Sequence, residues 1–506
     1  MLARARTVAF DGIEARIVEA QCVLTPGLPA FHIVGLPDKA VSEARERVRA
    51  AFSSLSIALP PRRITINLSP ADLPKAGSHF DLPIALALLG AIGIIPPEDL
   101  AQSVSLGELA LDGALVTVVG ALPAAMAAAA EDCALICPKS CGAEAAWVGA
   151  AQVFAPATLT EAIGHFTGKA PLARATPGEV PPDTGLRDLK DVKGQERAKR
   201  ALEIAAAGRH HMLLVGSPGS GKSMLAARMP GIMPPLSAAE ALETSMIHSL
   251  AGLLDEGGIS RSRPFREPHH TASVAAIVGG GRGAKPGEIS LAHNGVLFMD
   301  EFPEFPRTVL ETLRQPIETG EVVVARANAH TRYPCRFLLI AAANPCRCGY
   351  LTEPARACAR VPNCGEEYLG RISGPLMDRF DLRIEVPPVA WSDLDLPASG
   401  DCSAQIAARV AKARAVQSKR FAGHDGHRVN ADAEGALLED IATPDAEGRA
   451  LLARVADRFG LTARGYHRVL RVARTIADLD GTQEVRLPHI AEAVSFRLTV
   501  APEPVG

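Results

Sequence analysis

A glycine-rich segment, GSPGSGKS at positions 216–223, lies between an apolar run typical of a strand and a helical pattern. Glycines in such a loop let backbone N–H groups approach phosphate oxygens at a helix N-terminus. Lys222 can add a positive charge at the β- and γ-phosphates, and the hydroxyl of Ser223 can bind Mg²⁺. A turn without a ligand is the alternative, which the complete pattern disfavours. The predicted nucleotide-binding residues are Gly216, Ser217, Pro218, Gly219, Ser220, Gly221, Lys222 and Ser223.

Two acids end a second apolar run, GVLFMDE at 295–301. Asp300 can complete the coordination of Mg²⁺, and Glu301 can orient a water molecule and take its proton during attack on the γ-phosphate. The pairing indicates hydrolysis rather than binding alone. The two motifs together therefore predict an ATPase that uses ATP and Mg²⁺.

These residues need a frame that brings their strand ends together. The runs HMLLVG (211–216), GVLFMDE (295–301) and FLLIAAAN (337–344) are separated by helical patterns, which predicts a mostly parallel sheet in an α/β fold. Pro-rich stretches at 169–185 and 387–401 are predicted to be linkers or long loops. We expect an α+β domain at 1–168, a linker at 169–188, the ATPase core at 189–388, a second linker at 389–402 and a helical domain at 403–506.

The composition limits the location and partners of the protein. The longest apolar run, residues 82–95, is shorter than a membrane span and is predicted to be a buried helix. The start of the chain, MLARARTVAF, has no apolar segment typical of a secretory signal, so we expect a reducing cytoplasm and no membrane partner. With a net charge of −3, any affinity for nucleic acid must come from local basic segments.

Beyond the phosphate-binding motifs, the chain resembles the AAA+ ATPases. Asn344, after the strand pattern 337–344, matches the position of the sensor-1 residue, although an Asn before Pro345 also suits a turn. Within SGPLMDRFDLRIEV (373–386), Arg379 matches an arginine finger that reaches a neighbouring subunit's γ-phosphate. Arg464, near the start of a helical pattern, resembles the sensor-2 arginine of a helical lid that closes onto nucleotide. Ordinary surface arginines are the alternative for both.

Three longer segments carry a narrower resemblance. The residues 191–223, FREPHHTASVAAIVGGG (265–281) and RISGPLMDRFDL (371–382) look like the ComM/YifB family of magnesium-chelatase-like AAA+ proteins, and the resemblance covers nearly the whole chain. It implies a homo-hexameric, ATP-driven DNA motor that promotes branch migration in homologous recombination during natural transformation. It also implies a helix-2 insertion and a pre-sensor-1 hairpin.

Both implied insertions are locally basic. Residues 259–287 hold five basic residues against one acid, and 320–337 holds three arginines against Glu321. Aromatic residues are 4% of the chain, which favours sequence-neutral phosphate contacts over base stacking. A solvated, flexible surface is the alternative. The candidate DNA contacts are Arg261, Arg263, Arg266, Arg282, Lys285, Arg326, Arg332 and Arg336.

Four cysteines follow Asn344 within 19 positions, and four thiolates suit tetrahedral Zn²⁺. The candidate ligands are Cys346, Cys348, Cys358 and Cys364. Their irregular spacing leaves a loop of reduced, non-liganding cysteines as the alternative, while a redox pair is disfavoured because C-x-x-C is lacking there. If metal binds, it should be a structural clip, since the predicted site of phosphoryl transfer has its own metal and base.

The segment 68–90 resembles the active-site region of the Lon-type protease fold. The position that holds the nucleophilic serine in that fold is occupied here by His79, and Ser78 lies one residue before it. The segment 118–131, where the lysine of the Ser–Lys dyad is expected, contains no lysine. We therefore expect a catalytically inactive, Lon-protease-like domain. The alternative is a protease in which His79 acts as an unfamiliar base. The rival functions are a chelatase-type motor for metal insertion into a tetrapyrrole and an AAA+ unfoldase or protease.

Overall fold

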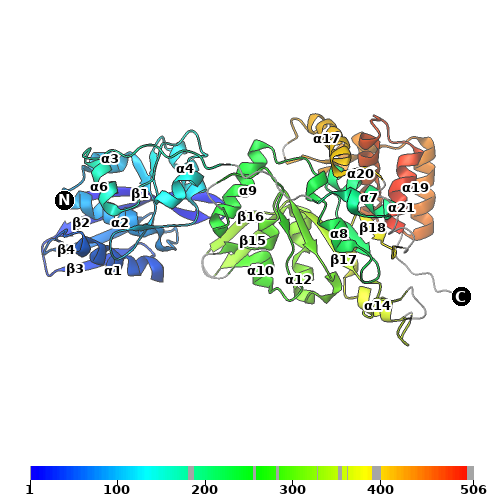
Figure 1. The fold of residues 1–506 in the computed structure, drawn as a ribbon, viewed down its shortest axis with the longest axis horizontal. Coiled ribbons are helices and arrows are strands. Elements are labelled where there is room, and N and C mark those ends of the chain that lie inside the picture. The colour runs from blue at the N-terminus through cyan, green and yellow to red at the C-terminus, as the bar shows by residue number, and fades with distance from the viewer. Residues whose placement is uncertain are drawn as a thin grey trace.

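The computed structural model describes residues 2–179, 187–254, 258–280, 284–326, 329–351, 356–361, 363–389, 400–424 and 426–498, and for residues 325, 326, 329, 330 and 498 it describes only the backbone. Figure 1 shows an elongated molecule with the amino-terminal part at one end and the helical carboxy-terminal part at the other. None of the described helices has the length and apolar character needed to cross a membrane.

The amino-terminal part is a seven-stranded mixed sheet with helices. A long hairpin of β1 (Leu2–Asp11) and β2 (Glu14–Thr25) is central, and the strand order is β3-β4-β2-β1-β5-β8-β9. The remaining strands are β3 (Ala30–Val34), β4 (Arg63–Ser69), β5 (Ser103–Ser105), β8 (Ala134–Ile136) and β9 (Val153–Phe154). All residues of α2 (Asp81–Ala91) are buried, which confirms the predicted buried helix as far as Ala91. The other main helices are α1 (Lys39–Ser54), α4 (Ala121–Ala130) and α6 (Leu159–Phe166).

The middle part contains a five-stranded sheet in the order β11-β14-β17-β10-β18, and all of its pairs are parallel. The strands are β11 (Phe265–Arg266), β14 (Val296–Met299), β17 (Leu338–Ala343), β10 (Met212–Val215) and β18 (Leu382–Glu385). Each of β10, β14 and β17 is buried at every position, as expected for a parallel sheet covered on both faces. The predicted mixed α/β fold with a parallel sheet is confirmed.

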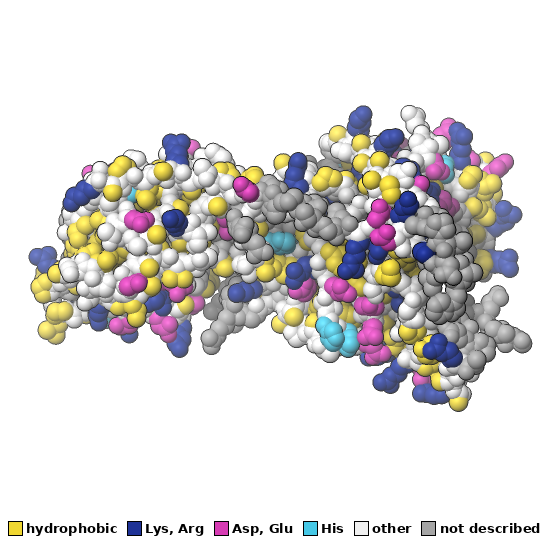
Figure 2. Space-filling view, in the orientation of Figure 1, with side chains coloured by type: hydrophobic (Ala, Val, Ile, Leu, Met, Phe, Trp, Pro, Cys, Tyr) yellow, Lys and Arg dark blue, Asp and Glu magenta, His cyan; other side chains and the backbone are white. Residues whose placement is uncertain are grey.

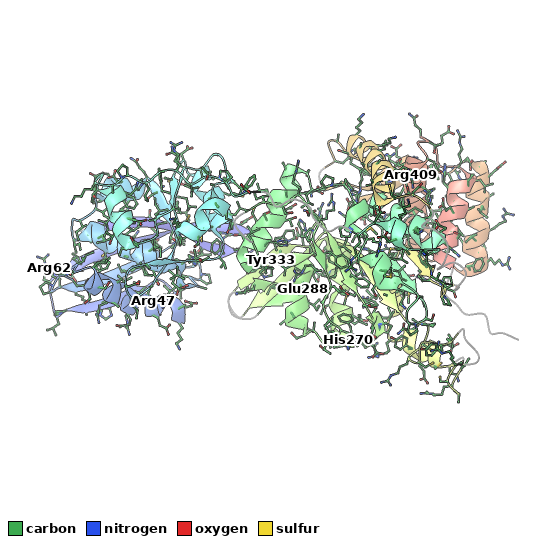
Figure 3. The ribbon with its side chains drawn as sticks, in the orientation of Figure 1. Arg47, Arg62, His270, Glu288, Tyr333 and Arg409 are labelled. Atoms are coloured by element: carbon green, nitrogen blue, oxygen red, sulfur yellow. The ribbon has the colours of Figure 1, made fainter. Side chains whose placement is uncertain are left out.

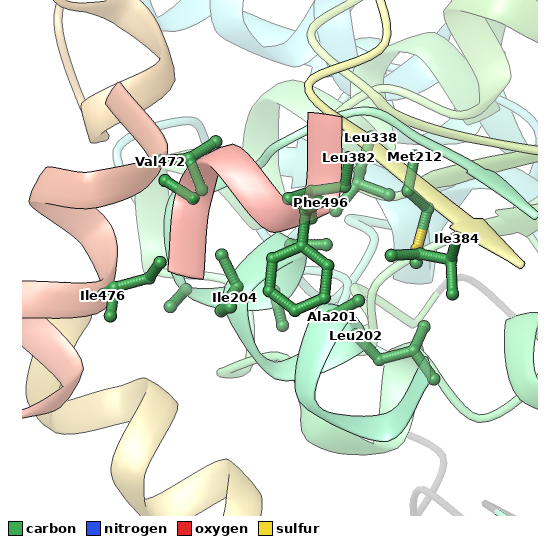
Figure 4. Packing of buried hydrophobic residues seen from close by; sticks show 14 of the residues in the cluster. Ala201, Leu202, Ile204, Met212, Leu338, Leu382, Ile384, Val472, Ile476 and Phe496 are labelled. Atoms are coloured by element: carbon green, nitrogen blue, oxygen red, sulfur yellow. The ribbon is translucent and has the colours of Figure 1, made fainter. Parts of the chain in front are cut away.

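Helices make up the carboxy-terminal part: α17 (Ser403–Arg420), α18 (Gly435–Ala442), α19 (Ala446–Phe459), α20 (Ala463–Leu479) and α21 (Leu487–Leu498). They share a hydrophobic core with the sheet and with α7 (Glu196–Gly208). Figure 4 shows Phe496 from α21 among Ala201, Leu202 and Ile384. These helices are therefore packed onto the sheet domain through a continuous core.

The first predicted linker is partly ordered along the amino-terminal sheet. Arg174 forms an isolated bridge with Phe154, and the Ala175 N–H donates to the Val153 carbonyl at 2.9 Å. At the other end of this stretch, Asp188 accepts a bond from the Ser403 N–H at 2.8 Å, so it lies against the start of α17. Residues 180–186 of this linker, and 390–399 of the second, lie outside the described residues.

The amino-terminal part packs against the sheet domain at two places. At the first, the β1–β2 turn meets a hairpin of β15 (Glu321–Arg326) and β16 (Ala329–Pro334), the two strands expected around 327–331. Gly12 has φ +65°, and a Cβ there would lie 2.2 Å from the Arg332 carbonyl oxygen. At the second, α4 packs against α9 (Ala238–Ala251), and the Ser249 hydroxyl donates to the Glu144 carboxylate. Figure 1 shows both meeting points.

Candidate nucleotide site

The phosphate-loop, acidic-pair and Asn344 motifs meet at one edge of the parallel sheet. The strands β10, β14 and β17 run side by side, with Val215 opposite Ala343 and Met299 opposite Ala341. Their carboxyl ends therefore deliver Gly216, Asp300 and Asn344 to the same edge. Gly216 must lack a side chain, because a Cβ there would lie 2.2 Å from the Val386 carbonyl oxygen.

Lys222 lies at the centre of this arrangement, in the first turn of α8 (Lys222–Ala226). Its ammonium donates to the carbonyls of Gly216 at 2.7 Å and Ser217 at 2.9 Å, and to the Asn344 side-chain oxygen at 3.2 Å. Burial lowers the pKa of Lys222, while the charges of Asp300 and Glu301 act in the opposite direction. The lysine is thus held in the loop, with Asn344 as one of its partners.

Ser223 and Asp300 present oxygen atoms of the kind that bind Mg²⁺. The Ser223 hydroxyl donates to Asp300 Oδ2 at 2.7 Å, and Asp300 Oδ1 accepts the Glu301 N–H at 2.8 Å. A hydroxyl and a carboxylate this close, facing a loop that can hold phosphates, fit the hard oxygen donors that Mg²⁺ prefers. The two predicted metal-binding residues therefore lie together.

Glu301 adopts a positive φ of +49°, which is uncommon for a residue with a side chain, and its side chain is half exposed. His270 approaches it, with 3.2 Å between His270 Nδ1 and Glu301 Oε2. Figure 3 labels His270 on the sheet domain, and the same area of Figure 2 shows histidine side chains beside carboxylates. The sequence motifs did not single out His270, whose only signal was the His-His pair that precedes the apolar run SVAAIV.

Arg379 and Arg464 lie near each other. Arg379 is buried, pairs with Glu318 at 2.6 Å, and donates to the carbonyls of Arg314 at 3.0 Å and Pro375 at 2.6 Å. Burial lowers the pKa of Arg379, and the charge of the nearby Arg464 contributes in the same direction. The bonds described for Arg379 thus hold it to neighbouring backbone and to Glu318, and its predicted role as a finger stays a prediction.

Arg464 is exposed and lines a pocket of about 620 Å³ between α13 (Arg314–Thr319) and α20. Arg209, Arg336, Arg468 and Arg471 line the same pocket, whose described lining includes no residue of the phosphate loop. The expectation that Arg464 closes the helical lid onto nucleotide stays a prediction.

Three of the four candidate zinc ligands lie together. The sulfur atoms of Cys346, Cys348 and Cys364 lie within 4.8 Å of one another, and Cys358 contributes to the pKa shifts of Cys348 and Cys364. Bonds from backbone N–H groups, first from Tyr350, lower the pKa of Cys348 to about 7. Tetrahedral zinc needs sulfur atoms about 3.8 Å apart, and the spacing of these three sulfur atoms is compatible with three of its four ligands.

The cysteine loop also contacts the phosphate loop. A Cβ on Gly349 would lie 2.6 Å from Pro218 Cδ, so the two loops are in close contact. Asn344 precedes Cys346 by two residues, and the same segment therefore carries both the contact to Lys222 and the thiols.

The candidate DNA contacts divide into two groups. Arg263 donates to the carbonyls of Pro234 and Asn294 at 2.6 Å each, Arg266 makes two bonds to Glu288, and Arg336 donates to the Gly426 carbonyl. These three are held by bonds within the chain, and their assignment as DNA contacts stays a prediction. Exposed side chains remain at Arg261, Lys285 and Arg332. Arg282 and the side chain of Arg326 lie outside the described residues.

The amino-terminal part shows no arrangement typical of a Ser–Lys protease in its described residues. Ser78 donates its hydroxyl to the Glu108 carboxylate, and Lys75 is buried against the Pro70 carbonyl. His79 is also buried, its ring nitrogen lies 2.9 Å from the Val8 carbonyl oxygen, and burial lowers its pKa to about 4. His79 is thus enclosed and Ser78 bonds to an acid, and the inactivity of this domain stays a prediction.

A parallel sheet with these motifs at one edge defines a P-loop ATPase. Three family descriptions match: magnesium chelatase, subunit ChlI, over residues 188–394; subunit ChlI of Mg-chelatase over 18–140; and magnesium chelatase, subunit ChlI C-terminal, over 400–497. The chain belongs to the ComM/YifB family of magnesium-chelatase-like AAA+ proteins, and this family implies ATPase activity.

Relatives match the chain over almost its full length. The competence protein ComM of Haemophilus influenzae is 43% identical over 500 residues, covering 97% of this chain and 96% of the relative. The uncharacterized protein YifB of Escherichia coli K12 is 42% identical over 494 residues, covering 97% and 96%. The magnesium-chelatase 38 kDa subunit of Rhodobacter capsulatus is 27% identical over 212 residues, which cover 38% of this chain and 54% of that subunit.

Proposed function

We propose that this protein is a homo-hexameric, ATP-driven DNA motor of the cytoplasm that promotes branch migration in homologous recombination during natural transformation. The observation that carries the proposal is the convergence of Lys222, Ser223, Asp300 and Asn344 at one sheet edge, beside Glu301. The competence name of the Haemophilus influenzae relative supports the biological setting.

The residues of one chain supply most of the chemistry of hydrolysis. Lys222 would exchange its carbonyl partners for phosphate oxygens, and Glu301 would accept the proton of the attacking water. Mg²⁺, when bound by Ser223 and Asp300, would neutralise charge on the phosphates. Arg379 would complete the site of a neighbouring subunit as an arginine finger, and Arg464 would close the helical lid onto nucleotide as a sensor-2 residue.

The proposed DNA contacts are Arg261, Lys285 and Arg332, with Arg282 and Arg326 as further predictions. On the face shown in Figure 2, basic and acidic side chains are intermixed, so no extended basic surface is seen there. Binding would then rest on a few arginines and lysines at the insertion and the hairpin, repeated in each subunit. Such phosphate contacts weaken steeply as the salt concentration rises.

We further propose that Cys346, Cys348, Cys358 and Cys364 hold a structural zinc ion, since the sulfur atoms of Cys346, Cys348 and Cys364 lie within 4.8 Å of one another and Cys358 lies between them in the sequence. We also propose that the chain is organised as an amino-terminal Lon-protease-like domain at 1–168, the ATPase core at 189–388 and a helical lid at 403–506. The core that α21 shares with β18 and α7 means that the lid and ATPase core would move together unless this packing opens.

Steady-state ATPase activity of the full-length protein tests the proposal. Turnover should be measured with no DNA and with single-stranded, duplex and four-way-junction DNA at two salt concentrations. We expect salt-sensitive stimulation that is largest on branched DNA. ATPase activity without stimulation by any of these DNAs would contradict the motor.

A chelatase-type motor is the second candidate, because the three matching family descriptions are those of magnesium chelatase. Stimulation of ATP turnover by a tetrapyrrole with Mg²⁺, and not by DNA, would favour it. A protease is the weaker alternative, because the Ser78 hydroxyl bonds to Glu108 rather than to a lysine. Degradation of casein by the purified protein would revive it.

A further inference from the structure

An arginine of α20 binds the short segment around Arg379, which joins α15 (Gly374–Met377) to β18. Arg468 donates to the Arg379 carbonyl at 3.0 Å and to Asp381 Oδ1 at 2.7 Å. The other oxygen of Asp381 accepts the His211 N–H at 3.0 Å, directly before β10 begins. One side of the segment is therefore fixed both to the carboxy-terminal helices and to the sheet.

An arginine of α21 binds the other side of the same segment. Arg497 donates to the Phe380 carbonyl at 3.0 Å and to Asp378 Oδ1 at 3.1 Å. Its side chain is 5% exposed, and a Cβ on Gly465, in the first turn of α20, would lie 3.2 Å from Arg497 Nη2. The guanidinium of Arg497 thus lies against α20 as well as against the segment. Two consecutive carbonyls and the carboxylates on either side of them are all bound by these two helices.

The side chain of Arg379 is turned inward. It is buried, it pairs with Glu318 at 2.6 Å, and it donates to the Arg314 carbonyl at 3.0 Å. To reach a phosphate of another subunit, the guanidinium has to leave these partners on α13. The direction that it then takes depends on the backbone of Arg379, because the side chain rotates about bonds that start at this Cα.

We propose that Arg468 and Arg497 are positioning residues that orient Arg379 toward the nucleotide of a neighbouring subunit. Because their bonds come from α20 and α21, a change in the orientation of these helices moves the Arg379 backbone with them. The carboxy-terminal helices of one subunit would thereby set the rate of hydrolysis in the next. This inference rests on the proposed function, in which Arg379 is the arginine finger of a homo-hexamer.

The first test is the variant Arg497→Gln in the full-length protein. We expect kcat to fall about 10- to 100-fold, because an error of about 1 Å in the position of a catalytic group costs up to about 10²-fold. KM for ATP should stay within about twofold of wild type, since the bonds described for Arg497 include no phosphate-loop residue. Arg486→Gln is the matched control, because Arg486 lies just before α21 and pairs with Glu484 on the surface at 3.0 Å.

Mixed assemblies separate positioning from a general structural role. Lys222→Ala chains keep Arg379 but lose turnover at their own site, whereas Arg379→Ala chains keep the site but lose the finger. Mixing the two should regain part of the turnover. Arg497→Gln added to the Lys222→Ala chain should remove the regained turnover, because that chain supplies the finger. The same change added to the Arg379→Ala chain should leave it intact.

Three results would overturn the positioning role: unchanged kcat in Arg497→Gln, a rise in KM alone, or equal loss whichever chain of the mixture carries the change. If mixing Lys222→Ala with Arg379→Ala regains no turnover, the finger itself is wrong and the inference fails with it. Circular dichroism, thermal melting and ATP binding identify a misfolded variant. Asp378→Asn, which leaves the bond from Arg497 to Phe380, then replaces Arg497→Gln in both tests, with the same direction expected.

Discussion

At the scale of single residues, the nucleotide site depends on a few oxygen and nitrogen atoms with defined partners. The Lys222 ammonium bonds to Asn344, and the Asp300 carboxylate bonds both to Ser223 and to the backbone of Glu301. Because these groups are linked, a change at one affects the orientation of the next. Glu301 is the exception, since its carboxylate faces His270 and solvent instead.

Glu301→Gln should abolish turnover while ATP still binds. The amide is nearly the same size as the carboxylate but cannot take a proton from water, so kcat should fall about 10²- to 10³-fold. Single-turnover hydrolysis and equilibrium ATP binding measure the two effects separately. Glu304→Gln is the matched control, because that carboxylate pairs with Arg371 at 2.9 Å. Wild-type turnover in Glu301→Gln would remove Glu301 from the mechanism.

His79 gives the amino-terminal domain a dependence on pH. Its folded-state pKa of about 4 lies below the ordinary value of 6.5, because burial disfavours the charged ring. The neutral histidine therefore contributes full stability above pH 6.5, and this contribution declines as the pH falls toward 4. The slope is about 1.4 kcal/mol per pH unit for one proton. Denaturation curves between pH 7 and 4 should show a smaller loss of stability in His79→Asn than in the wild type. Equal losses in the two proteins would exclude His79 as the cause of the pH dependence.

At the scale of elements, the candidate DNA contacts separate into exposed and internal arginines. Arg332→Ala, on the exposed side of β16, should weaken DNA binding and lower the salt slope by about 1 while leaving the melting temperature unchanged. Arg263→Ala should instead destabilise the protein by about 2–4 kcal/mol, because it leaves two carbonyls and Glu240 without their partner. Fluorescence anisotropy and thermal melting distinguish the two, and the reverse pattern would refute this division.

The cysteine loop should respond to metal removal. Purified protein should contain about one zinc per chain, and Cys348→Ser or Cys364→Ser should lose it. Because Gly349 lies against Pro218, ATP affinity should also decrease in these variants. Elemental analysis and ATP titration provide the measurements, and Cys402→Ser serves as a control outside the cluster. If the wild-type protein contains no zinc and still binds ATP with full affinity, the zinc proposal is wrong and the thiols are ordinary reduced cysteines.

The sequence predicted the elements better than the contacts between them. The apolar runs ending in Gly216, Asp300 and Asn344 indicated parallel strands, and parallel strands must bring their carboxyl ends together. The contact of His270 with Glu301 depends on the register of β11, which has only two residues and no pattern of its own. For the same reason, the sequence could not distinguish the internal Arg263 from the exposed Arg332, since charge alone does not specify a partner.

At the scale of the whole molecule, the junction between the amino-terminal sheet and the hairpin can be tested at Gly12. Gly12→Ala should destabilise the junction by about 1–3 kcal/mol, because its Cβ would meet the Arg332 carbonyl oxygen at positive φ. Hydrogen exchange in β15 and β16 should increase. Gly168→Ala is the matched control, with φ +68° and no atom within 4 Å of its Cβ. Equal effects of the two changes would mean that backbone strain, and not the contact, is responsible.

The contact between Gly349 and Pro218 also bears on how samples of this protein behave. Chelator washes are a common way to strip Mg²⁺ from an ATPase before nucleotide is added back. If the thiols hold zinc, such a wash would also loosen the segment that packs on the phosphate loop, and replenishing Mg²⁺ would not restore the starting state. The storage buffer and the reducing agent would then affect the measured binding and hydrolysis of ATP.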